Sequence, residues 1–133
     1  MTRTIYLAGP MENVSIDLQT GWRNKAAFQL LSAGWNVLDP VARSLKDGYN
    51  HKRIYELDMR DVRESDVILA DLRRDKREAH GTAMEVQEAY RSDIPVVGWA
   101  TKDQKRHPFL EVCVTEWVTD LDKGIHILNE FYK

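Results

Sequence analysis

The stretch DVILA, residues 66–70, decides the fold because one carboxylate is followed by an unbroken apolar run. A strand that is covered on both faces of a parallel sheet has this pattern, whereas a half-exposed strand alternates. Other short β-rich runs occur at residues 4–8, 35–38 and 94–99. Residues 112–118 are a candidate fifth strand, although a helix is also compatible with that segment. The pattern predicts a sheet of about five parallel strands.

Segments with helical periodicity separate these strands. Residues 18–33, 53–64 and 81–91 are predicted helices, and Asp120 is a candidate cap for a last helix. Strands that alternate with helices predict an α/β fold, here a Rossmann-like or flavodoxin-like sheet with helices on both faces. The polar residues 41–52 are predicted to form a loop over a site. We expect residues 1–133 to form a single domain.

The composition restricts the partners that we expect. The 133-residue chain has a formal net charge of −2 and a pI of about 6.1. This charge gives no electrostatic reason to expect a nucleic acid or a membrane as the partner. Cys113 is the single cysteine, which fits a reducing cytoplasm and excludes an intrachain disulfide. No metal-ligand spacing or nucleotide-binding glycine motif occurs, so we expect no metal and no cofactor.

The loops after the strands carry the first candidate site residues. Ligands of parallel sheets bind beyond the carboxyl ends of the strands, here after residues 8, 38, 70 and 99. Gly9-Pro10 ends the first strand, and Gly9 permits a ligand or another part of the chain to come close. Tyr6 points its hydroxyl at a site or is a core tyrosine. Asp71 ends the third strand and could line the same site.

Asp58 and Glu85 are candidates on helices. Asp58 shares a helical stripe with Ile54 and Val62, where a carboxylate is costly unless it is paired. Glu85 has two interpretations. With Thr82 it forms a capping-box pattern, and on spacing alone this structural role is favoured. A first-turn glutamate is also kept ionised by the helix dipole, as a glycosyl nucleophile requires.

The charged loop after the third strand contains the basic residues Arg73, Arg74, Lys76 and Arg77. Such a run is more often a solvated loop, but it could also meet a phosphate.

Four segments resemble the nucleoside 2-deoxyribosyltransferase family and its relatives, the 2′-deoxynucleoside 5′-phosphate N-hydrolases. The resemblance begins at IYLAGPM (5–11) and continues through GWNVLDP (34–40). It is strongest in LDMRDVRESDVILADL (57–72) followed by HGTAMEVQEAY (80–90). Together with the segments between them, these blocks cover most of the chain in the order of the family.

This resemblance implies an enzyme that cleaves the N-glycosidic bond of a 2′-deoxynucleoside through a covalent deoxyribosyl-glutamate intermediate. Glu85 falls on the nucleophile of the family, Asp58 on its substrate-holding aspartate and Tyr6 on its first-strand tyrosine. The remaining residues that we expect to bind the substrate are Gly9, Pro10, Asp71, His80, Gly81, Met84 and His107. His107 would act in the site of a neighbouring subunit, which implies a homodimer or a higher homo-oligomer.

Departures from the family pattern leave the acceptor and the substrate open. A transferase passes the sugar to another nucleobase, and a hydrolase passes it to water. Ala79 stands where the transferases have an aspartate, and its neighbours Glu78 and His80 could deliver a proton to the base. Residues 10–12 do not supply the serines and arginine of the monophosphate hydrolases. A deoxynucleoside monophosphate is therefore the alternative substrate, and a nucleotide-binding sensor without turnover is a second alternative.

Overall fold

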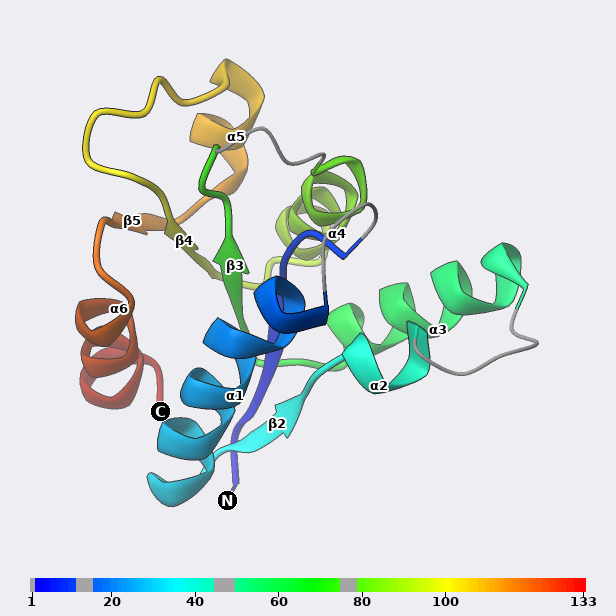
Figure 1. Ribbon diagram of the computed structural model, residues 1–133, viewed down its shortest axis with the longest axis horizontal. Coiled ribbons are helices and arrows are strands. Elements are labelled where there is room, and N and C mark those ends of the chain that lie inside the picture. Colours follow the sequence, from blue (N-terminus) through cyan, green and yellow to red (C-terminus); the bar gives the residue numbers. More distant parts are fainter. Residues whose placement is uncertain (1, 12–15, 45–49, 75–78) are drawn as a thin grey trace.

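The protein is described by a computed structural model over residues 2–11, 16–44, 50–74 and 79–133. A five-stranded parallel sheet in the order β2-β1-β3-β4-β5 forms its centre (Figure 1). The strands are β1 (Thr4–Ala8), β2 (Asn36–Leu38), β3 (Val67–Asp71), β4 (Val96–Trp99) and β5 (Glu116–Val118). The predicted α/β fold with a parallel sheet is confirmed.

Helices cover both faces of this sheet. They are α1 (Ile16–Ser32), α2 (Val41–Ser44), α3 (His51–Arg63), α4 (His80–Arg91), α5 (Pro108–Cys113) and α6 (Leu121–Ile127), followed by a π-helical turn (Leu128–Tyr132). None of the helices in the described ranges is long and apolar enough to cross a membrane.

Alternate side chains of β1 enter two separate cores. Ile5 and Leu7 pack with residues of α1 and α6 on one face of the sheet. Tyr6 and Ala8 pack with residues of α3 and α4 on the other face. Successive side chains of a strand point to opposite faces, so Tyr6 necessarily faces α3 and α4 when its neighbours face α1. This alternation decides which helices can contribute to a site around Tyr6.

The loop predicted for residues 41–52 is wrong at both ends. Residues 41–44 form α2, which begins where the carboxylate of Asp39 accepts a hydrogen bond from the Val41 amide, 3.1 Å long. α3 already begins at His51, because Asn50 caps it by accepting a bond of 2.7 Å from the Arg53 amide. Residues 45–49 lie outside the described part of the chain. Local hydrogen bonds to the side chains of Asp39 and Asn50 therefore outweighed the polar composition of the segment.

Residues 112–118 contain both of the structures that the sequence left open. The segment starts in the last turn of α5, and its end forms β5. The predicted cap of the last helix is confirmed, since the Asp120 side chain accepts hydrogen bonds from the amides of Asp122 and Lys123.

Gly98 in β4 provides a test of the packing beneath α5. A Cβ at this position would lie 2.9 Å from Cγ1 of Val114 and 3.2 Å from Cδ1 of Leu72. We expect Gly98→Ala to lower the free energy of unfolding by about 1–3 kcal/mol, the usual cost of overpacking. Gly21 in α1 is the control, because nothing lies within 4 Å of its added Cβ. Gly21→Ala should stabilise the protein by about 0.5–1 kcal/mol in urea unfolding. A Gly98→Ala protein of wild-type stability would contradict the packing.

Candidate active site

Tyr6 and Glu85 meet between the sheet and α4. Tyr6 is fully buried on the sheet face that α3 and α4 cover. Its hydroxyl donates a hydrogen bond to Oε2 of Glu85, which projects from the buried face of α4. Oε1 of Glu85 has no hydrogen-bond partner within the described ranges. Tyr6 therefore binds one carboxylate oxygen of Glu85 and leaves the other without a hydrogen bond from a described residue.

Burial controls the acidity of this pair. Loss of hydration raises the pKa of Glu85 to about 8, because it disfavours the charged form of a carboxyl group. The hydrogen bond from Tyr6 and the charge of Arg23 oppose this rise in pKa, whereas the Asp58 carboxylate adds to it. Burial also raises the pKa of Tyr6, so the phenol remains a proton donor. Glu85 therefore holds a proton at neutral pH when no ligand is bound.

The capping box predicted from Thr82 and Glu85 is wrong. α4 begins at His80 after Ala79, and no side-chain hydrogen bond from a described residue caps this end. Thr82 is buried inside the helix, and its Oγ1 has no hydrogen-bond partner in the described part of the protein. Glu85 lies in the second turn, beyond the first-turn positions that the helix dipole favours for a carboxylate. The dipole therefore does not keep Glu85 ionised, because burial has the larger effect.

Asp58 lies on the buried face of α3, beside this pair. Its Oδ1 accepts a hydrogen bond from Arg43 of α2, which also donates a bond of 2.8 Å to Oδ2 of Asp61. Loss of hydration raises the pKa of Asp58, and the Arg43 guanidinium opposes that rise. The charge of Asp58 raises the pKa of both Glu85 and Tyr6. The fold thus brings together the three residues for which the resemblance implied catalytic roles.

A fully buried arginine, absent from the predicted site residues, supports this arrangement. Arg23 of α1 donates hydrogen bonds of 2.9 Å to the Leu7 carbonyl and the Asp39 carboxylate, and one of 2.8 Å to the Gly9 carbonyl. These acceptors lie at or just beyond the carboxyl ends of β1 and β2. A sequence signal was present, because Arg23 precedes Ala26 by three residues on the apolar side of the predicted helix.

Gly9 and Asp71 are neighbours at the carboxyl edge of the sheet, where Pro10 is also buried. A Cβ on Gly9 would lie 2.7 Å from Cζ2 of Trp22 and 3.3 Å from Cβ of Asp71. Side chains of the protein itself therefore pack closely against Gly9. Asp71 is fully buried, and both of its carboxylate oxygens accept hydrogen bonds of 2.9 Å from Arg73. Arg73 therefore binds both oxygens of the Asp71 carboxylate.

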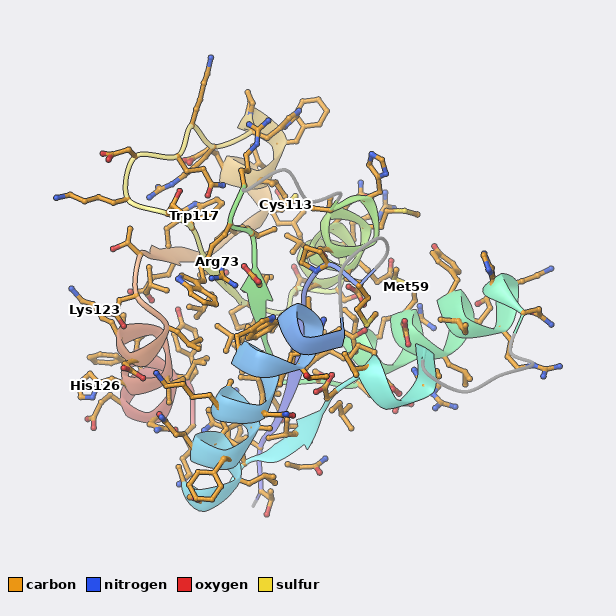
Figure 2. All side chains as sticks on the ribbon, viewed as in Figure 1. Met59, Arg73, Cys113, Trp117, Lys123 and His126 are labelled. Atoms are coloured by element: carbon orange, nitrogen blue, oxygen red, sulfur yellow. The ribbon has the colours of Figure 1, made fainter. Side chains whose placement is uncertain are left out.

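The other predicted residues lie on the opposite side of α4. His80, Met84 and His107 line a cavity of about 890 Å³ between α4 and α5, and Gly81 is exposed beside it. Glu85 is not part of its wall, because helical periodicity turns it to the buried face of α4. Figure 2 labels three other lining residues, which are Arg73, Cys113 and Trp117. The predicted site residues therefore lie on two opposite sides of α4.

His107 has a local structural role as well. Its side chain caps α5 by accepting a hydrogen bond of 3.1 Å from the Phe109 amide. Lys76, Arg77 and Glu78 lie outside the described residues, so the predicted phosphate contact of that loop stays a prediction. Within residues 2–11, 16–44, 50–74 and 79–133, no group of three or more His, Cys, Asp or Glu side chains could hold a metal ion.

Comparison with known proteins identifies the family of this chain. Residues 5–126 match the family described as nucleoside 2-deoxyribosyltransferase, and the chain belongs to that family. No curated protein matches the sequence.

Solved structures have the same fold at low sequence identity. A 2-deoxyribosyltransferase of Bacillus psychrosaccharolyticus superimposes with a TM-score of 0.75 at 19% identity, over 90% of this chain and 88% of that one. A Leishmania mexicana 2-deoxyribosyltransferase gives 0.74 at 17% identity, over 98% and 99% of the two chains. The CMP N-glycosidase of Clostridium botulinum gives 0.68 at 13% identity, over 97% and 100%. Fold and family together indicate an enzyme of the deoxyribosyltransferase or N-glycosidase type.

The buried carboxyl group of Glu85 makes stability depend on pH. Its pKa of about 8 in the folded protein lies above the ordinary value of 4.5, so the folded state binds more protons between these values. The stability that Glu85 contributes is therefore fully present below the unfolded pKa and is lost as pH rises through the folded pKa. Glu85→Gln lacks this titration. Between pH 4.5 and about 8, the free energy of unfolding of Glu85→Gln should increase relative to that of wild type by up to about 1.4 kcal/mol per pH unit.

Urea unfolding at unit steps of pH measures this difference. Tyr6→Phe is the second variant, because it removes the hydrogen bond that lowers the pKa of Glu85 and should extend the range to higher pH. A constant difference between wild type and Glu85→Gln at all pH values would show that Glu85 titrates normally.

Proposed function

We propose that this protein cleaves the N-glycosidic bond of 2′-deoxynucleosides, with Glu85 as the nucleophile. The hydrogen bond between Tyr6 and Glu85 carries this proposal, because it holds one carboxylate oxygen and leaves the other free. Asp58 lies beside the pair with one carboxylate oxygen bound by Arg43. Its second oxygen could therefore accept a hydrogen bond from a sugar hydroxyl. Membership of the nucleoside 2-deoxyribosyltransferase family supports these assignments.

The reaction proceeds in two displacements at the anomeric carbon. Oε1 of ionised Glu85 forms a bond to this carbon while the carbon–nitrogen bond breaks, and the base leaves with the electron pair and gains a proton. A second nucleobase or water then forms a bond to the same carbon and loses its proton, and Glu85 departs as a carboxylate. Two inversions retain the configuration of the sugar. Tyr6 keeps Oε2 in place through both steps.

The acceptor and the substrate remain alternatives in this proposal. A nucleobase acceptor makes the protein a nucleoside 2-deoxyribosyltransferase, and water makes it a hydrolase. A deoxynucleoside 5′-monophosphate is the alternative substrate. A non-catalytic nucleotide sensor would use the same residues without turnover.

Turnover assays separate these functions. The protein is incubated with each deoxynucleoside and deoxynucleoside monophosphate, with and without a free base, and base release and exchange are followed. We expect Glu85→Ala and Glu85→Gln to lower kcat by about a thousand-fold or more, as removal of a nucleophile does. The value of kcat/KM for wild type should rise with pH towards about 8, as Glu85 ionises in the free enzyme.

Glu88→Gln is the matched control for this loss. Glu88 lies on the same helix, but its carboxylate forms an exposed ion pair of 2.9 Å with Arg63 of α3. Base exchange without net release would identify a transferase, and release alone a hydrolase. Normal turnover by Glu85→Ala would show that another residue is the nucleophile, whereas no turnover by wild type would favour the sensor.

A second copy of the chain is the partner that we propose for the face formed by α4 and α5. Four large apolar side chains on this face line the cavity and are 49–77% exposed, namely Met84, Tyr90, Phe109 and Val112. Contiguous exposed apolar surface of this kind is typical of an interface. His107 lies on the same face, so a second copy here would bring this residue towards the neighbouring subunit.

Phe109→Glu tests this interface. Phe109 is 77% exposed, and a charge at that position should dissociate the oligomer, because an unpaired carboxylate is costly to bury between subunits. Phe131→Glu is the control, since Phe131 is equally exposed at 78% but lies in the C-terminal π-helical turn. Analytical ultracentrifugation should show a smaller particle for Phe109→Glu alone. A monomeric wild-type protein would contradict the proposed partner.

A further inference from the structure

Arg43 joins two carboxylates of α3 from outside that helix. Its Nη1 donates to Oδ1 of Asp58, and its Nη2 donates to Oδ2 of Asp61 at 2.8 Å. Asp58 and Asp61 are three residues apart, which places both side chains on one face of α3. The side chains of all three residues are 80–90% buried, so this is not a surface ion pair that solvent screens.

The position of Arg43 is fixed by contacts that lead back to the centre of the protein. α2 contains only Val41–Ser44, and its start is held by the hydrogen bond of 3.1 Å from the Val41 amide to Oδ1 of Asp39. The same oxygen accepts a bond of 2.9 Å from the buried Arg23. Arg23, Asp39 and α2 thus form a connected support that sets where the Arg43 guanidinium lies relative to α3.

The contact with Arg43 affects both the orientation and the charge of the Asp58 carboxylate. A carboxyl group that loses water on burial tends to remain protonated, and a nearby guanidinium stabilises its ionised form. Because Arg43 binds only Oδ1, the geometry leaves Oδ2 without a hydrogen-bond partner among the described residues. Three charged groups from three helices act on Asp58, and they are Arg43, Asp61 and Arg23. Asp58 in turn raises the pKa of Glu85 and Tyr6, which face it from α4 and β1. Arg43 is the cation among them that contacts Asp58 directly.

We propose that Arg43 is a positioning residue, which bridges Asp58 and Asp61 and thereby holds the Asp58 carboxylate ionised and directed at the substrate. This inference rests on the proposed function, because it assigns the oriented oxygen of Asp58 to a hydroxyl of the bound sugar. Arg43 itself touches Asp58 and Asp61 rather than the reacting atoms. The guanidinium suits this role because its separate nitrogens reach both carboxylates, whereas a lysine ammonium supplies the charge as a single point.

Titration of Asp58 tests the inference without any substrate. The carboxyl carbon of Asp58 is followed by carbon-13 NMR against pH and assigned with Asp58→Asn. Arg43→Gln should raise the pKa of Asp58, because it removes the adjacent positive charge. Arg43→Lys should hold this pKa closer to the wild-type value. An Asp58 pKa that is the same in Arg43→Gln and wild type would overturn the proposal.

Arg60→Gln is the matched control. Arg60 lies on α3 and contacts Asp61 at 3.4 Å, but its side chain is 52% exposed and does not contact Asp58. We expect Arg60→Gln to leave the Asp58 titration and kcat/KM at their wild-type values. Thermal unfolding of each variant confirms that it is folded before it is compared.

Kinetics complete the test. Arg43→Gln should lower kcat/KM by about 100-fold, the order of loss expected when a substrate-binding group is misplaced by about 1 Å. Arg43→Lys should recover part of this loss, and the pH profile of Arg43→Gln should shift with the Asp58 pKa. An Arg43→Gln enzyme with the kcat/KM of Arg60→Gln would overturn the inference and leave the proposed function standing. A wild-type protein without turnover would instead refute the proposed function, and the Asp58 titration would still decide the ionisation part of the inference.

Discussion

The buried guanidinium of Arg23 is the interaction on which the carboxyl edge of the sheet depends. It donates hydrogen bonds to the carbonyl oxygens of Leu7 and Gly9, which lie at and just beyond the end of β1. A buried cation is tolerated only when it is paired and hydrogen-bonded, and Asp39 at the end of β2 supplies the counter-charge. Asp39 also accepts a hydrogen bond from the start of α2. The pair of Arg23 and Asp39 therefore positions both the end of β1 and the helix that carries Arg43.

The alternation of β1 then determines which carboxylates can meet. Ile5 and Leu7 enter the core beneath α1, so Tyr6 must face α3 and α4. Asp58 and Glu85 lie on the buried faces of those two helices, where apolar residues would stabilise the protein more. Arg43 and Tyr6 offset part of this cost by hydrogen bonding to one carboxylate each. The remaining cost of burial raises the pKa of both carboxyl groups.

The strands and the buried acid could be predicted from the sequence because each depends on a local pattern. The run at residues 66–70 required cover on both faces, and Asp58 stood out as a carboxylate on an apolar stripe. Arg23 and Arg43 could not be assigned with the same certainty, because their partners are distant in sequence and long basic side chains usually reach solvent. The capping-box pattern of Glu85 failed for the same reason. A tertiary contact with Tyr6, 79 residues away, outweighed the local hydrogen bond that spacing suggested.

The raised pKa of Glu85 is compatible with a nucleophilic role, although the residue is largely protonated at neutral pH. One pH unit below a pKa of about 8, roughly a tenth of the molecules carry the carboxylate. This adds about 1.4 kcal/mol to the barrier, which is small beside the roughly 8–23 kcal/mol by which enzymes lower barriers. A carboxylate of higher pKa is also the stronger base, and the positive charge that develops on the sugar stabilises its ionised form in an apolar site. The burial that weakens Glu85 as an acid would therefore make its ionised form a stronger nucleophile.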